Sequence, residues 1–113
     1  MEFKLNFPSG YHLSDTLNNN LDINVILGND KVYFFTLFTL ENINYLMNKK
    51  DSEFSNLYFW ANDMLIVKDL KLETIKKTIS DLIDKDYFDN IFVQIGDVTS
   101  IFGYPPIFGM LID

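Results

Sequence analysis

The chain contains no cysteine and no arginine, and its single histidine is His12. The lack of cysteine excludes disulfide bonds, thiolate nucleophiles and thiolate metal sites. A small domain without disulfides is typical of a reducing compartment, so we expect a cytoplasmic protein. Residues 1–5 lack the basic start and apolar stretch of a secretory signal, and no run reaches the roughly eighteen apolar residues of a membrane span. We therefore expect an unprocessed protein without a membrane segment.

The sequence also has few residues suited to catalysis. His12 belongs to the residue type most often used as a general base, but no nucleophile or orienting partner is recognisable beside it. Gly103 and Gly109 flank two prolines and lack the strand-to-helix setting of a phosphate-binding loop. The sequence therefore predicts no cofactor and a protein that is not an enzyme. An enzyme that works with a pair of aspartates is the alternative.

Acidic residues are the most abundant polar feature, with sixteen Asp and Glu against nine Lys and a formal net charge of -7. Hydrophobic residues at 48% and aromatic residues at 16% are too abundant for a disordered acidic segment, so the charge lies on a folded body. Phosphate contacts are made mostly by Arg and Lys, which disfavours direct binding of nucleic acid. The charge instead predicts a basic partner.

Alternating apolar residues predict a β-hairpin in the first half of the chain. Its arms are residues 22–27 and 31–38, and Gly28, Asn29 and Asp30 form the turn between them. The second arm is apolar on both faces, so we expect it to be central in the sheet. Residues 3–7 are compatible with a further short strand, which the predicted order given below does not include. The aromatic residues in such apolar runs are more typical of a core than of a base-stacking surface; they are Phe34, Phe35, Phe38, Tyr58, Phe59 and Trp60.

Two helices are predicted. Thr39 is suited to cap the first, which should end between residues 48 and 50. Asp69 is the expected N-cap of the second. The second helix has an apolar stripe at helical spacing, formed by Leu72, Ile75, Ile79, Leu82 and Ile83.

The rest of the chain predicts further strands. Residues 57–60 and 64–67 are expected to form two short strands about a turn at 61–63, with one bent strand as the alternative. Another strand is expected at 91–95, followed by an apolar tail from Ser100 to Asp113. We therefore expect residues 1–113 to form a single α+β domain. Its predicted architecture is a sandwich of a mixed, mostly antiparallel β-sheet with two helices packed on it, in the order ββαββαβ.

Two groups of residues are candidates for partner binding. The first is an acidic group at the end of the second predicted helix, formed by Asp81, Asp84, Asp86 and Asp89. Its spacing does not match a calcium-binding loop, so we predict no metal and interpret it as an acidic surface. The second is Trp60 with Asp63 in a predicted turn, where loops present recognition residues. The competing interpretation places Trp60 in the core, with Asp63 closing an Asx turn.

Three blocks of the sequence, at residues 34–43, 58–67 and 73–83, resemble small immunity proteins of bacterial contact-dependent growth inhibition and related polymorphic toxin systems. The resemblance implies a cytoplasmic protein that binds the toxin domain delivered by a sibling cell and blocks its active site. Such toxins are often nucleases, and a nuclease cleft must be basic to attract polyphosphate.

The resemblance supplies no contact residues, so the candidates rest on charge and loop position alone: Asp81, Asp84, Asp86, Asp89, Asp63 and Trp60. The alternative function is a homo-oligomeric or adaptor domain that hides the apolar residues 107–112 against another subunit. Both functions predict a protein partner. The protein is expected to be a monomer or a homodimer, and a monomer would favour the apolar tail packing on its own sheet.

Overall fold

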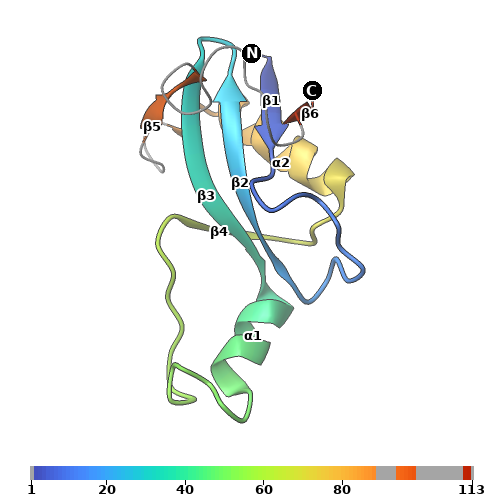
Figure 1. Ribbon diagram of the computed structural model, residues 1–113, viewed down its shortest axis with the longest axis vertical. Helices are drawn as coiled ribbons and strands as arrows, with labels where there is room; N and C mark the ends of the chain where they lie inside the picture. Colours follow the sequence, from blue (N-terminus) through green and yellow to red (C-terminus); the bar gives the residue numbers. More distant parts are fainter. Residues whose placement is uncertain (1, 89–93, 99–110, 113) are drawn as a thin grey trace.

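The predicted hairpin is the centre of the sheet. The computed structural model describes residues 2–88, 94–98 and 111–112. In chain order, the elements are β1 (Phe3–Asn6), β2 (Asn20–Leu27), β3 (Lys31–Thr39), α1 (Leu40–Asn48), β4 (Met64–Val67), α2 (Leu72–Asp84), β5 (Gln94–Asp97) and β6 (Leu111–Ile112) (Figure 1). The fold is therefore α+β, as predicted.

The sheet has six strands in the order β4-β3-β2-β1-β6, with β5 also paired to β3. The β2–β3 ladder is antiparallel and runs from the pair Asn20–Phe38 to the pair Ile26–Val32. β4 lies parallel to the end of β3, whereas β5 lies antiparallel to its beginning. Since β3 pairs with three strands, its predicted central place is confirmed, and so is the mixed, mostly antiparallel sheet.

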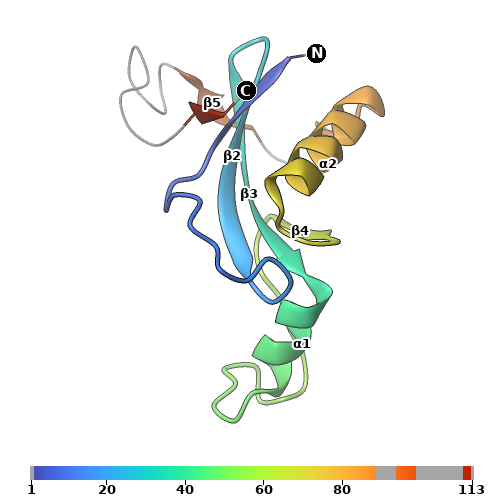
Figure 2. The same ribbon diagram turned by 90° about the vertical axis from the view of Figure 1, so that its right-hand side faces the viewer.

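The core lies between the sheet and α2, which covers one face of the sheet (Figure 2). Ile75, Ile79 and Leu82 of α2 are buried against strand residues such as Ile23 and Phe35. Burying each such side chain stabilises the fold by about 1.5 to 3 kcal/mol. The predicted stripe is confirmed, and its two outer members are partly buried.

The strand predicted at residues 57–60 is absent, which corrects the expected order. Only β4 lies between the helices; three strands precede α1 and two follow α2, so ββαββαβ holds approximately. Tyr58 and Trp60 are exposed and Phe59 between them is half-buried, so the segment has the alternation of a strand. The edge of β3 next to it is taken by β4, which leaves the segment without a ladder partner among the described strands.

The cap predicted for α2 is also wrong. The N-cap is Lys71, whose side chain makes no capping hydrogen bond. Asp69 lies two residues earlier, and its Oδ1 accepts a hydrogen bond from the Lys71 backbone N–H at 2.9 Å. Leu70 is fully buried and its N–H donates to the carbonyl of Thr16 at 2.8 Å. Burial of Leu70 therefore delays the start of the helix.

Part of the predicted C-terminal structure lies outside the described residues. This holds for residues 91–93 of the expected strand and for residues 100–110 and 113 of the apolar tail. The described remainder of the strand, β5, continues to Asp97. Leu111 and Ile112 form β6, which pairs with β1.

The first helix lies away from the core. α1 continues the line of β3, and residues 49–63 return from its far end to β4, so residues 40–63 form a lobe beyond one end of the sheet (Figure 1). The rest of the described chain is termed the body. Within α1, Asn42 alone is buried. The radius of gyration is 14.8 Å, against roughly 13 Å for a spherical domain of this length, in keeping with a projecting lobe.

Candidate functional site

Exposed apolar side chains gather on the lobe. Of the nine large apolar residues that are exposed in the described part of the chain, five belong to it: Leu40, Tyr45, Leu57, Tyr58 and Trp60. Leu57 is 80% exposed and Trp60 is 60% exposed. Single exposed apolar residues are ordinary, but a group of them on one projecting element is typical of an interaction surface. The lobe is therefore the candidate site.

Polar side chains fix the first turn of α1 to the body. The Thr39 hydroxyl accepts from the Asn42 N–H at 3.1 Å, as predicted for the N-cap, and donates to the carbonyl of Leu17 at 2.6 Å. The Asn42 side-chain amide donates to Asn18 at 3.1 Å, and its oxygen accepts from Asn20 at 2.9 Å. This hydrogen-bond network explains why an asparagine is the buried residue of α1.

The other end of α1 is closed by its own loop. The Asn56 side chain donates to the carbonyls of Met47 and Lys49 at 3.0 and 3.1 Å, and the Ser52 hydroxyl donates to Leu46 at 2.9 Å. Carbonyls in a last helical turn have no partner within the helix, so these bonds satisfy groups that would otherwise need water. Ser55 and Asn56 adopt left-handed backbone angles to make the turn. The loop is thus held in one conformation.

A series of ring contacts leads from the sheet to the surface of the lobe. Phe38, at the buried end of β3, lies 5.1 Å from Phe59 between ring centroids. Phe59 lies 4.9 Å from Phe54, and Phe54 lies 5.7 Å from Tyr58 in an edge-to-face arrangement. These distances are in the range that favours aromatic pairs. The Tyr58 ring is therefore held by packing that extends back to the sheet.

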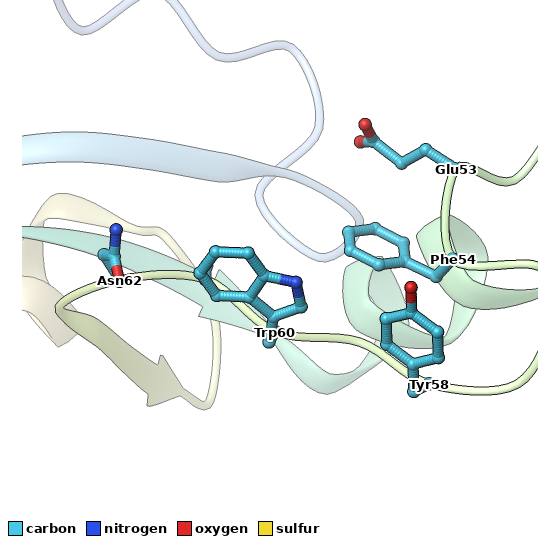
Figure 3. A pocket seen from close by; sticks show the side chains of 6 residues that line it. Glu53, Phe54, Tyr58, Trp60 and Asn62 are labelled. Carbon is cyan, nitrogen blue, oxygen red and sulfur yellow. The ribbon is translucent and has the colours of Figure 1, made fainter.

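The rings of Phe54 and Tyr58 form one wall of an open pocket of about 360 Å³. Its lining consists of Glu53, Phe54, Tyr58, Trp60, Ala61 and Asn62. Figure 3 shows the rings of Phe54 and Tyr58 on one side and the indole of Trp60 on the other, with the indole nitrogen directed toward the first pair. Glu53 is exposed and brings a carboxylate to the rim. The pocket thus combines flat aromatic surface with one negative charge.

The two predicted clusters are not brought together. Trp60 lines the pocket and is exposed, so the interpretation that places it in the core is wrong, as is the expectation that Tyr58 is core. Asp63 ends the lobe as an exposed residue with a left-handed backbone (φ 48°), and its carbonyl accepts from the Thr36 N–H at 2.9 Å. It thereby leads the chain into β4.

The acidic cluster lies at the C-terminal end of α2, at the opposite end of the molecule from the lobe (Figures 1 and 2). Asp81, Asp84 and Asp86 are exposed, and Asp89 lies outside the described residues. Asp81 pairs with Lys85 at 2.9 Å, and this hydrogen bond raises the pKa of Lys85. Surface pairs of this kind contribute little, and the Asp81 carboxylate is already partnered.

Sequence reasoning missed Glu53, Phe54, Tyr58 and Asn62 as pocket residues. Their spacing carries no motif, because the pocket exists only once Ser52 and Asn56 close the loop on α1. The available signal was composition, since Phe54 is an aromatic residue inside the otherwise polar stretch 49–56.

Among the residues that the structure describes, no group of three or more His, Asp or Glu is placed to hold a metal ion. Over the same ranges, none of the helices has both the length and the apolar character needed to cross a membrane. Comparison of the chain with protein-family models, with curated proteins and with solved structures found no match. The likeness to immunity proteins therefore stays a prediction.

Proposed function

We propose that the protein is a non-catalytic inhibitor that acts in the cytoplasm, binding a basic protein toxin, of which a nuclease is the leading candidate, and neutralising it as an immunity protein does. The observation that supports this proposal best is the gathering of exposed aromatic and leucine side chains on a projecting, hydrogen-bonded lobe. The sequence resemblance and the net charge of -7 supply the kind of partner.

Shape and charge have separate tasks in this proposal. Trp and Tyr are the residues that most often anchor protein interfaces. A lobe whose conformation is already fixed loses little conformational entropy when it binds. The net negative charge accelerates encounter with a basic cleft but adds less to the lifetime of the complex. The lobe therefore makes the central contact, with Trp60 as an anchor and Asp63 beside it.

The acidic residues at the end of α2 have a different role in this proposal from the direct contact that the sequence suggested. Asp81, Asp84 and Asp86 lie far from the lobe, so a partner seated on the lobe does not need to touch them (Figure 2). They contribute to the field that steers the partner, as does any exposed carboxylate of the body. Charge reversal there should slow association and leave dissociation nearly unchanged.

The test is to identify the gene immediately upstream, to co-express the protein with the C-terminal domain that this gene encodes, and to measure growth protection and the dissociation constant of the complex. We expect Tyr58→Ala and Trp60→Ala each to weaken binding by about tenfold or more, since truncating an anchor costs about 1.4 kcal/mol or more. Tyr87→Ala is the matched control, because Tyr87 is an exposed tyrosine of the body.

Two results would contradict the proposal. One is a toxin domain that neither binds nor is neutralised by the protein. The other is a lobe that binds a second copy of the chain, seen as a dimer in sedimentation that Trp60→Ala converts to a monomer; this would support the homo-oligomeric alternative.

A further inference from the structure

We propose that the pocket between Trp60 and Tyr58 receives an arginine side chain of the partner, with its guanidinium stacked on the indole and paired with the Glu53 carboxylate. This inference rests on the proposed function, because it assumes a basic protein as the partner. It goes further by naming the chemical group that the pocket recognises and the residues that hold it.

The lining of the pocket matches the two properties that distinguish arginine. A guanidinium is flat and weakly hydrated, so it stacks on aromatic faces, and tryptophan is the strongest partner for such a cation. Its N–H groups also pair with a carboxylate. The pocket provides an indole that is 60% exposed, a tyrosine ring that is 50% exposed and a carboxylate at the rim.

Neither the Glu53 carboxylate nor the Trp60 indole contacts a cation from the described part of the chain. On α2, Glu73 and Asp81 each have a lysine partner at 2.9 Å, whereas Glu53 has no ion-pair partner within residues 2–88, 94–98 and 111–112. On the lobe, the Lys49 ammonium lies 5.9 Å from the centre of the Tyr45 ring. No such cation covers Trp60 among the described residues. The pocket is therefore open to a cation from outside.

The wall of the pocket that Phe54 and Tyr58 form is also in place before binding. Tyr58 packs edge-to-face on Phe54, and the Phe54 N–H donates to the Ser52 hydroxyl at 3.1 Å. Ser52 and Asn56 in turn bond to the end of α1. A cation entering the pocket does not have to order these side chains, so the interaction loses less entropy than it would on a mobile loop.

The experiment is an NMR titration of the protein with a short peptide that carries one arginine between glycines. Trp60 is the only tryptophan, so the indole N–H gives a single resonance that reports on the pocket. We expect a saturable shift with the arginine peptide at low ionic strength. The same peptide with citrulline, which keeps the shape and loses the charge, should give no comparable shift.

A matched pair of variants separates the pocket from general charge. Glu53→Gln should weaken the arginine peptide by about threefold, in keeping with an exposed ion pair. Asp51→Asn removes the same charge from the same loop at a residue outside the pocket lining, and it should leave the affinity unchanged. Equal weakening by both variants, an equal response to citrulline, or no saturable shift would overturn the inference.

The titration also separates this inference from the proposed function. An arginine response in a protein that fails to bind the toxin domain contradicts the function and supports the pocket. A protein that binds the toxin domain, but whose indole resonance does not respond to the arginine peptide, contradicts the pocket and supports the function. An indole shift that follows protein concentration without peptide shows that a second copy occupies the pocket, and it overturns the inference.

Discussion

The two helices are attached to the same sheet by opposite means. α2 buries an apolar stripe and directs its charged residues to solvent, which is the usual arrangement of a surface helix. α1 buries Asn42 and leaves Leu40 and Tyr45 more than half exposed. The body thus buries its apolar residues, whereas the lobe is fixed by hydrogen bonds and a series of ring contacts and leaves several large apolar residues exposed.

This difference separates the residues that stabilise the fold from those that the fold leaves exposed. An apolar contact is undirected, and its contribution grows with the area that is buried. A hydrogen-bond network adds little net stability, but it fixes direction and is costly to break in a buried place. The lobe can therefore be changed at its surface without loss of the fold.

The largest effect should come from breaking the attachment of α2. Ile79 is fully buried in the core, so Ile79→Ala should lower the free energy of unfolding by about 2 to 5 kcal/mol. The matched change in the lobe is Leu40→Ala, which should alter it by no more than about 0.5 kcal/mol because Leu40 is 69% exposed. Urea unfolding measures both. Similar losses from the two variants would show that α1 is also held by apolar burial.

The body was also the part that the sequence predicted well, and the reason is physical. The hairpin and α2 each repeat apolar residues at the period of their secondary structure, so the local spacing of these residues identifies the buried face. Residues 57–60 are an apolar run of strand length, yet whether an extended segment finds a ladder partner depends on distant residues, here on β4 taking the edge of β3. Asp69 was misassigned for a related reason, since burial of Leu70 is a tertiary effect.

An intermediate effect should come from breaking the attachment of α1. Thr39→Val keeps the shape but leaves the Asn42 N–H and the Leu17 carbonyl without their partner, which should cost about 1 to 2 kcal/mol. Hydrogen exchange should accelerate in α1 more than in α2. Thr78→Val is the control, because the Thr78 hydroxyl only returns to the Thr74 carbonyl in its own helix. Equal acceleration in both helices would mean that the lobe and the body open together.

The candidate site shows the limit of local reasoning more clearly. Trp60 and Asp63 were found because a tryptophan and an acid in a turn are conspicuous one residue at a time. Glu53 and Tyr58 become neighbours only through the side-chain bonds of Ser52 and Asn56 to the end of α1. The acidic group at 81–86 was equally conspicuous, and the fold places it at the opposite end of the molecule.

The smallest effect should appear in acid, where each attachment has one carboxylate. The pKa of Asp69 is lowered, first by the hydrogen bond from the Thr74 side chain and then by that from the Lys71 backbone. Asp15 belongs to the loop whose residues bond the first turn of α1. Its pKa is lowered by hydrogen bonds from the backbone N–H groups of Asn18 and Leu17. Both carboxyls have usual values of 3.8, so the unfolded chain binds more protons near that pH.

Each carboxylate therefore stabilises the fold above about pH 4 and loses this contribution as the pH falls through its lower folded pKa. Urea unfolding of Asp69→Asn and Asp15→Asn between neutral pH and pH of about 3 should give a shallower acid decline for each than the unaltered protein shows. The intensities of backbone amide NMR signals, followed residue by residue, should show the effect of Asp69→Asn in α2 and that of Asp15→Asn in α1. If both variants changed α2 alone, the first turn of α1 would not depend on the loop at residues 15–18. Other contacts would then have to hold the lobe on the body.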